Sequence, residues 1–250
     1  MLPVPKFFAD GKNISAGRIV IDGDDALHIK NSLRLGVGDG ITVCDGNRVD
    51  YECRVASMEK GSVVLTPVGS RVSETEIPVA TTLYQAAVRG EKLELIIQKC
   101  VELGVCEINV VLTDNSVMRP GKSGQGLQWD EKKAIRYNKI SEAAAKQSMR
   151  GVVPRVNGLI PFEEAVARSL KSDLVFAPWE KERETGLRDL ITGRSYKTAG
   201  FFIGPEGGFS ERETGLFREN GIRTVTLGNR VLRTETAGLY VMAAMAYENS

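Results

Sequence analysis

The chain has 250 residues, of which 42% are hydrophobic and 26% charged, and its formal net charge is +1. That length allows one large or two modest domains with cores of their own, and the composition is that of an ordinary soluble globular protein. No apolar run approaches the roughly 20 residues of a membrane span, and the N-terminus lacks the basic-then-apolar layout of a secretion signal. We therefore expect a cytoplasmic protein.

The cysteines and histidines exclude several kinds of chemistry. The four cysteines form no CxxC pair and have no histidine cluster near them, so they lack zinc-ligand spacing, and we expect buried free thiols. His28 is the single histidine, which removes most mechanisms built on a histidine base, including the usual serine triads. The sequence also has no acidic metal cluster, so we expect no metal ion.

Residues 1–70 are typical of a small β-rich domain. Short strands are expected at Gly17–Ile21, Gly40–Cys44, Val49–Val55 and Val63–Pro67, with a short helix over Asp24–Leu33. The turn Asp45-Gly46-Asn47 between two apolar alternations is a good hairpin signal. Several short strands with turn residues between them indicate a small barrel.

From Val79 onward, strands alternate with helices. Val79–Ala87 has the pattern of a buried strand, a helix follows and ends at Gly104, and Val105–Leu112 completes a β–α–β unit. The alternation continues toward the C-terminus. It predicts an α/β domain with a mostly parallel sheet over residues 71–250.

Two later helices carry capping signals. Asp130 is the expected N-cap of a helix from about Glu131 to Arg150, and Ser210 with Glu213 forms a capping box for a helix over Glu211–Glu219. Further short strands are expected at Asp173–Ala177, Gly200–Ile203 and Thr224–Leu227.

Two glycine-rich turns follow neighbouring strands. Phe201–Ser210 (FFIGPEGGFS) runs from small apolar residues into the first turn, and the strand that ends at Leu227 leads into Gly228 and Asn229. Glycine lets backbone approach a ligand closely, and the carboxyl edge of an open α/β sheet is where ligands bind. The turns therefore predict a ligand site, and a pair of ordinary β–α turns is the alternative.

The last predicted helix, Thr234–Glu248, has almost no polar face. A helix that is apolar all round must be covered on all sides, and a single domain rarely covers a chain terminus that fully. Burial within a homodimer is the economical explanation. Deep burial in a monomer is the alternative.

Residues 116–150 carry eight basic and three acidic side chains, a local field that could hold phosphates. Basic residues of the predicted helix share one face, namely Lys132, Arg136, Lys139, Lys146 and Arg150. We favour nucleic-acid contact over the alternative of a solvated face, because acidic residues are scarce in this stretch.

In GPEGGFS (Gly204–Ser210), LGNRVLRTETA (Leu227–Ala237) and KCVELGV (Lys99–Val105), the chain resembles the bacterial 16S rRNA uridine-N3 methyltransferases of the SPOUT class. The likeness covers nearly the full length and includes Pro5–Phe8 and Glu142–Arg150. It implies a PUA-like β-barrel RNA-binding domain at residues 1–70. It also implies a methyltransferase domain with a C-terminal trefoil knot at residues 71–250.

The resemblance implies S-adenosylmethionine (SAM) as the methyl donor, bound among three adjacent loops without a metal. The product would be N3-methylated uridine at one specific position of 16S rRNA in the small ribosomal subunit, and alignment of the methyl group with N3 would be an orientation effect. The residues expected to hold SAM are Ala177, Pro178, Ile203, Gly204, Pro205, Glu206, Gly207, Gly208, Leu227, Gly228, Val231, Leu232, Thr234, Thr236 and Ala237.

Uridine N3 must lose its imide proton before or during the attack, and no histidine lies nearby in the sequence. The candidates for accepting the proton are Glu206, Glu235 or water, with a cation to stabilise the anion. Arg233 is our choice for that cation, because a guanidinium does not easily lose its charge. Glu235 could instead serve only to stabilise the dipole of the last helix.

On this hypothesis RNA is the substrate, and its target base has to be exposed or flipped out. The expected RNA contacts are Lys6, Arg34, Arg89, Arg119, Lys132, Arg136, Gln147 and Arg150. A non-catalytic RNA-binding or ribosome assembly factor is one alternative, and a methyltransferase of the same class acting on transfer RNA is another. A nicotinamide-dependent dehydrogenase is disfavoured, because the chain has no proper glycine fingerprint.

Overall fold

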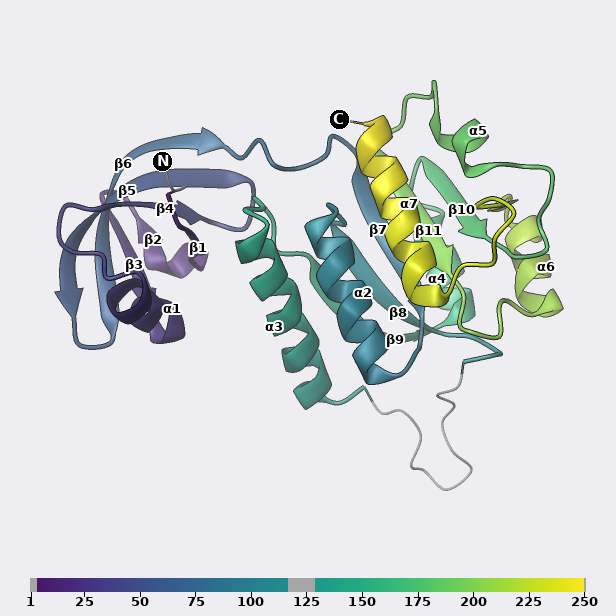
Figure 1. Ribbon diagram of the computed structural model, residues 1–250, viewed down its shortest axis with the longest axis horizontal. Coiled ribbons are helices and arrows are strands. Elements are labelled where there is room, and N and C mark those ends of the chain that lie inside the picture. The colour runs from purple at the N-terminus through teal and green to yellow at the C-terminus, as the bar shows by residue number, and fades with distance from the viewer. Residues whose placement is uncertain (1–3, 117–128, 250) are drawn as a thin grey trace. The chain divides into compact units, whose positions relative to one another are not determined.

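The computed structural model describes residues 4–116 and 129–249, which divide into two compact units (Figure 1). The first unit comprises Met1–Glu76 together with Ala145–Val153, and the second comprises Ile77–Ala144 together with Pro154–Ser250. The first unit therefore runs past residue 70, where the sequence placed its end, and takes in a segment from the middle of the chain.

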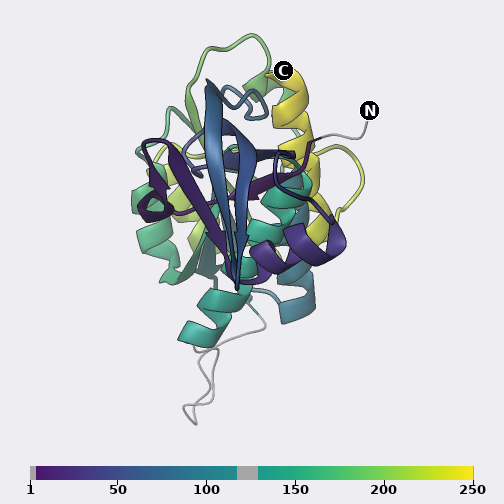
Figure 2. The ribbon, with the colours of Figure 1, turned by 90° about the vertical axis from the view of Figure 1, so that its left-hand side faces the viewer.

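A six-stranded sheet in the order β1-β4-β5-β6-β3-β2 forms the first unit. Its strands are β1 (Lys6–Phe8), β2 (Ile14–Ser15), β3 (Arg18–Asp22), β4 (Gly40–Cys44), β5 (Val49–Glu59) and β6 (Ser62–Val72). Neighbouring strands are antiparallel except for β1 and β4, which are parallel, and the long β5 and β6 are the blue strands that stand out in Figure 2. The short helical segments are η1 (Gly11–Asn13), α1 (Gly23–Leu27) and η2 (His28–Ser32), so the single helix expected over Asp24–Leu33 is two shorter pieces.

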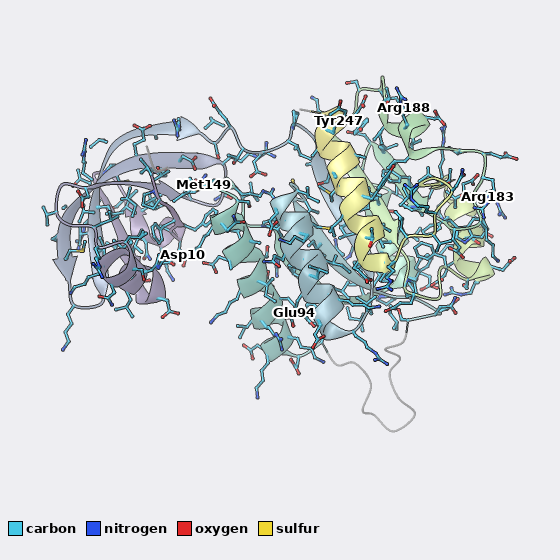
Figure 3. All side chains as sticks on the ribbon, in the orientation of Figure 1. Asp10, Glu94, Met149, Arg183, Arg188 and Tyr247 are labelled. Atoms are coloured by element: carbon cyan, nitrogen blue, oxygen red, sulfur yellow. The ribbon has the colours of Figure 1, made fainter. Side chains whose placement is uncertain are left out.

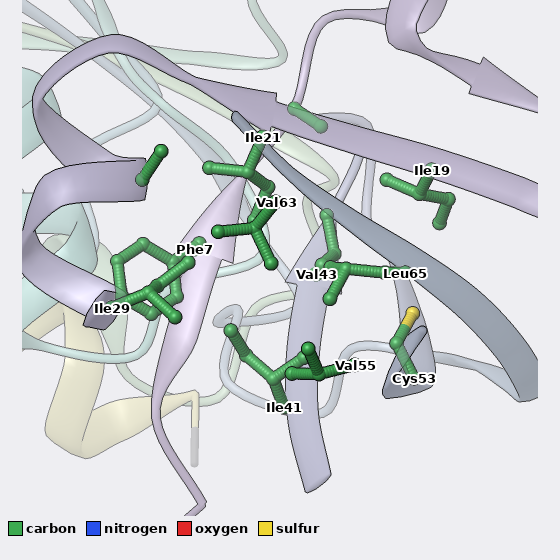
Figure 4. Close-up of a cluster of buried hydrophobic side chains, with 12 residues drawn as sticks. Phe7, Ile19, Ile21, Ile29, Ile41, Val43, Cys53, Val55, Val63 and Leu65 are labelled. Carbon is green, nitrogen blue, oxygen red and sulfur yellow. The ribbon is translucent and has the colours of Figure 1, made fainter. Parts of the chain in front are cut away.

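Aliphatic side chains fill the core of the first unit (Figure 4). Ile19 and Ile21 on β3, like Ile41 and Val43 on β4, are at most 3% exposed. Their spacing of two residues puts them on the same face of their strands. The sheet therefore buries the alternating apolar residues that its strands were predicted from.

The hairpin expected at Asp45-Gly46-Asn47 is confirmed, since β4 and β5 pair in antiparallel register on either side of it. Asp45 Oδ1 accepts hydrogen bonds from the backbone N–H groups of Asn47 and Val49, at 2.7 and 3.1 Å. This is the turn chemistry for which aspartate is favoured at such positions.

A buried ion pair joins β1 to β5. Lys6 Nζ lies 2.7 Å from Asp50 Oδ1, and the two side chains are only 2% and 8% exposed. The same ammonium group donates to Ser73 Oγ and to the backbone carbonyl of Met149, each at 3.2 Å. All three hydrogens of the lysine thus have acceptors within the first unit, which is the condition for burying a charge.

A second buried pair, Arg150 with Glu76, holds the middle segment within the first unit. Both side chains are 2% exposed, and the guanidinium donates to both carboxylate oxygens. The backbone N–H of Gly151 also donates to Glu76 Oε1, at 2.9 Å. The structure therefore does not support the expectation that Lys6 and Arg150 contact RNA, because both cations are paired in the interior, and such pairing cannot be read from the sequence.

The second unit is built on six parallel strands in the order β12-β10-β11-β7-β8-β9, which confirms the α/β class with a parallel sheet. The strands are β7 (Ala80–Ala86), β8 (Glu107–Leu112), β9 (Arg155–Pro161), β10 (Leu174–Pro178), β11 (Thr198–Ile203) and β12 (Arg223–Val225). The helices are α2 (Gly90–Glu102), α3 (Glu131–Gln147), α4 (Phe162–Ser169), α5 (Leu187–Ile191), α6 (Glu211–Glu219) and α7 (Thr234–Glu248).

Aromatic side chains fill one face of the parallel sheet. Tyr84 on β7 and Phe202 on β11 are register partners, and their rings stack with centroids 4.6 Å apart. Phe162 of α4 and Phe217 of α6 pack against Phe202, and both are at most 1% exposed. The next residue along β7, Gln85, points to the other face, where α2 and α7 lie side by side (Figure 1).

The capping signals of the sequence are confirmed. Asp130 Oδ1 accepts a hydrogen bond of 2.8 Å from the backbone N–H three residues into α3, and Ser210 with Glu213 forms the reciprocal capping box of α6. The helix expected to reach Arg150 ends at Gln147 instead. Met149 has a φ of 59°, in the left-handed region, where a right-handed helix cannot continue.

The expectation of buried free thiols holds for Cys44, Cys53 and Cys100, while Cys106 is partly exposed and also free. Burial raises the pKa of Cys44 and of Cys100 to about 12 and that of Cys53 to about 11. These three thiols therefore stay protonated and unreactive at neutral pH.

Replacing Arg150 by alanine should lower the free energy of unfolding by about 3–5 kcal/mol, because the Glu76 carboxylate would be left buried without its cation. Urea unfolding at neutral pH measures the loss. The matched control is Gln147→Ala, an exposed neighbour, which should change stability by less than about 0.5 kcal/mol. Wild-type stability of the Arg150 variant together with weakened RNA binding would contradict this assignment.

Candidate functional site

A cavity lies where the loops after β10, β11 and β12 meet. The three strands are parallel, so their carboxyl ends share one edge of the sheet, as the two glycine turns led us to expect. Of the residues expected to bind a cofactor, the cavity is lined by Pro178, Ile203, Gly204, Pro205, Gly208, Leu227, Gly228, Val231, Leu232, Thr234 and Ala237.

The remaining residues of that set lie next to the cavity and do not line it. Ala177 is buried at the end of β10, Glu206 and Gly207 are exposed in the turn after β11, and Thr236 is exposed on α7. The sequence analysis missed several lining residues, namely Trp179, Glu180, Arg183, Phe209, Thr226, Asn229 and Arg230. Most of them directly continue segments that were named, so extending each loop by a few residues would have found them.

The turn after β11 is tightly enclosed. Gly208 has a φ of 67°, and its backbone N–H donates to Pro205 O at 3.0 Å. A Cβ atom on Gly208 would lie 2.7 Å from Glu180 Oε1, and one on Gly207 would lie 3.1 Å from Asn115 Cβ. The two glycines are therefore required by side chains of neighbouring loops as well as by the backbone conformation.

The Thr234 hydroxyl joins the turn after β11 to the first residue of α7. Thr234 Oγ1 donates to Gly204 O at 2.7 Å and accepts a hydrogen bond from Gln85 Nε2 at 3.0 Å. Gln85 is fully buried at the end of β7. This chain of hydrogen bonds ties three separate segments together at the base of the cavity.

One lysine, which the sequence analysis did not single out, links two of the catalytic candidates. Lys92 Nζ, near the start of α2, lies 2.6 Å from Glu206 Oε1 and 3.9 Å from Glu235 Oε2. The hydrogen bond from Lys92 lowers the pKa of the Glu206 carboxyl. Glu235 Oε2 is buried and has no hydrogen-bond partner within residues 4–116 and 129–249. The third candidate, Arg233, is exposed at the N-cap of α7.

The loop after β10 is braced by its own side chains. Arg183 Nη1, labelled in Figure 3, donates to the backbone carbonyls of Glu180 and Glu182 at 2.6 and 2.9 Å. Trp179 lines the cavity, and its buried Nε1 has no partner in the described part of the chain. A buried polar atom without a partner is expected to meet a ligand or a water molecule.

The expected RNA contacts fall into several groups. Arg34, Arg89, Lys132 and Gln147 are exposed. Arg136 is also exposed, but its guanidinium lies 2.6 Å from Glu94 Oε1 of α2 (labelled in Figure 3). Lys6 and Arg150 are buried as described above, and Arg119 lies outside the described residues.

Comparison with known proteins identifies the family. A model of the RNA methyltransferase domain matches residues 75–246, and a model of the RNA methyltransferase PUA domain matches residues 21–68. The ribosomal RNA small subunit methyltransferase E of Bacillus subtilis is 32% identical over 91% of this chain and 89% of its own length. The chain belongs to the ribosomal RNA small subunit methyltransferase E family. It shares the family's α/β domain preceded by a PUA-like domain, while the trefoil knot stays a prediction.

Two solved structures of similar proteins contain SAM. The family member from Neisseria gonorrhoeae, bound to SAM, is 30% identical with a TM-score of 0.83, and 98% of each chain is covered. A structure from Legionella pneumophila with the bound cofactor SAM is 25% identical with a TM-score of 0.82, and again 98% of each chain is covered.

Two other kinds of site were searched for. In residues 4–116 and 129–249, no group of three or more histidine, cysteine, aspartate and glutamate side chains could hold a metal ion. None of the helices described here is both long and apolar enough to cross a membrane.

Proposed function

We propose that this chain is a SAM-dependent methyltransferase that methylates N3 of a uridine in 16S rRNA of the small ribosomal subunit. The target is uridine 1498 in the usual bacterial numbering. The observation that carries the proposal is the cavity between the three loops, whose lining contains most of the residues expected to hold the donor. Membership of the family and the SAM-bound structures of similar proteins support the same conclusion.

The residues of the cavity fit the donor. Leu227, Val231 and Leu232 offer apolar contacts for the adenine ring, and the glycine turns offer backbone N–H and C=O groups for its edge. The unpartnered indole N–H of Trp179 adds a hydrogen-bond donor. When bound, SAM supplies an activated methyl group, because a sulfonium is a good leaving group.

The imide proton of uridine N3 is assigned to Glu235. Glu206 is the weaker candidate, because the hydrogen bond from Lys92 lowers the pKa of its carboxyl and makes it a poor base. Glu235 is partly exposed, with 16% of its side chain accessible, and one of its oxygens lacks a hydrogen-bond partner among the described residues. Arg233, two residues before Glu235, supplies a fixed positive charge for the uridine anion.

RNA binding is assigned to the exposed members of the expected set. These are Arg34 in the first unit, Arg89 before α2, Lys132 and Arg136 on α3, and Gln147 at the end of α3. Arginine and lysine contacts to phosphates position an RNA without reading its sequence. Arg119 stays a prediction.

A homodimer is part of the proposal. α7 is buried on one side by Val241, Met242 and Met245, while Tyr240 and Tyr247 (Figure 3) are 45% and 85% exposed. On α2, which packs against α7, Leu95 is 42% exposed. Large apolar side chains exposed on adjoining helices are typical of an interface, and we assign this face to a second copy of the chain.

The function is tested by incubating the purified protein and labelled SAM with small ribosomal subunits from a strain that lacks it. Label should appear on a single uridine, at N3, as mapped by mass analysis of nuclease fragments. Label on transfer RNA or on a ribose hydroxyl would replace the proposed substrate. Absence of any heat on titration with SAM would instead favour a non-catalytic binding factor.

The assignment of the two acids predicts unequal effects of matched substitutions. Glu235→Gln should lower kcat by about 100-fold or more, since it removes the proton acceptor, while Glu206→Gln should lower it by less than about tenfold. Single-turnover rates at saturating SAM and RNA measure both. A larger loss in the Glu206 variant would reverse the assignment.

The dimer predicts that Tyr240→Glu converts the protein to a monomer, because a charge would be buried in an apolar interface. Sedimentation equilibrium reports the mass directly. Val37→Glu, at an apolar residue 71% exposed in the first unit, is the control and should leave the dimer intact. A monomeric wild type would show that this face has another use.

A further inference from the structure

The turn that borders the cavity is held from outside by an asparagine that no motif pointed to. Asn115 follows β8, and its Nδ2 donates to the backbone carbonyls of Gly207 and Gly208, at 3.2 and 3.1 Å. These residues lie 92 and 93 positions further along the chain. The asparagine thus forms two hydrogen bonds with one short stretch of backbone.

The residue before this asparagine is tied to the other end of the same turn. Asp114 N donates to Glu213 Oε1 at 2.8 Å, and Asp114 Oδ2 accepts from Ser210 Oγ at 2.6 Å. Glu213 is fully buried and caps α6 through Ser210. Arg212 holds Asp114 as well, donating to both of its carboxylate oxygens at 3.0 and 2.9 Å. The backbone that carries Asn115 is therefore fixed relative to α6.

Glycine pairs need such support more than other residues do. Gly207 and Gly208 have no side chains to restrict their backbone angles, and glycine loses more conformational freedom on ordering than any other residue. A binding loop that is already ordered before its ligand arrives binds more tightly, because the ordering cost is not charged to the binding step. Two hydrogen bonds to consecutive carbonyls supply that order.

We propose that Asn115 is a positioning residue for the donor site. It holds the Gly207–Gly208 turn in the conformation that borders the cavity, without itself lining the cavity. This inference rests on the proposed function, since it names SAM as the ligand whose affinity the turn controls. It adds a residue from β8 to a site otherwise built from the loops after β10, β11 and β12.

Calorimetric titration of SAM into the full-length protein tests the proposal. Asn115→Ala should weaken SAM binding by about tenfold, the size expected when two neutral hydrogen bonds no longer hold the turn. Asn115→Asp keeps the size of the side chain but replaces the donor by a carboxylate facing two carbonyl oxygens, so it should weaken binding at least as much. The control is Asn220→Ala, which removes a similar amide bond, Nδ2 to Leu216 O at 2.9 Å, away from the cavity and should leave SAM affinity unchanged.

Kinetics separate positioning from a general loss of structure. Both Asn115 variants should raise KM for SAM about tenfold while KM for the RNA and kcat at saturating SAM stay within about twofold of wild type, with an unchanged midpoint of thermal unfolding. SAM affinity equal to wild type in both variants would overturn the inference. So would equal losses of affinity for SAM and RNA. If the wild type itself gives no heat with SAM, the proposed function fails first, and the two failures are thereby distinguished.

Discussion

The cavity depends on the absence of side chains at two consecutive positions of one turn. Gly207 meets Asn115 and Gly208 meets Glu180, so the loops after β8 and β10 close against the turn after β11 from separate directions. Backbone conformation adds a second restriction, because Gly208 has a positive φ. Glycine at these positions therefore lets neighbouring loops approach one another, in addition to leaving backbone groups open to a ligand.

The chemistry of the site follows from the unequal surroundings of two carboxylates. Lys92 binds Glu206 at 2.6 Å but stands 3.9 Å from Glu235, so one acid is kept ionised and engaged while the other keeps an unpartnered oxygen. Environment, more than residue type, decides which of two acids can accept a proton. A cation between them is a simple way to give the two acids different roles.

The buried pairs of the first unit show how a basic residue can serve structure. Lys6 and Arg150 belong to stretches that resemble the family, and Arg150 continues the basic pattern of α3, yet both are neutralised by Asp50 and Glu76. Together they hold the segment after α3 within the first unit. Their charges are thus a condition for the packing of that unit and are not available at its surface.

The sequence alone determined the strand and helix pattern, the hairpin at Asp45, the capping box at Ser210 and the two glycine turns, because each depends on residues a few positions apart. It also determined most of the cavity lining, since parallel strands bring their carboxyl ends to one edge wherever the connections run. Only the tertiary structure decided that Arg150 pairs with Glu76, that Lys92 stands between two acids, and that Asn115 braces Gly207. Each of these contacts joins residues dozens of positions apart, and their distances depend on side-chain packing that no local pattern encodes.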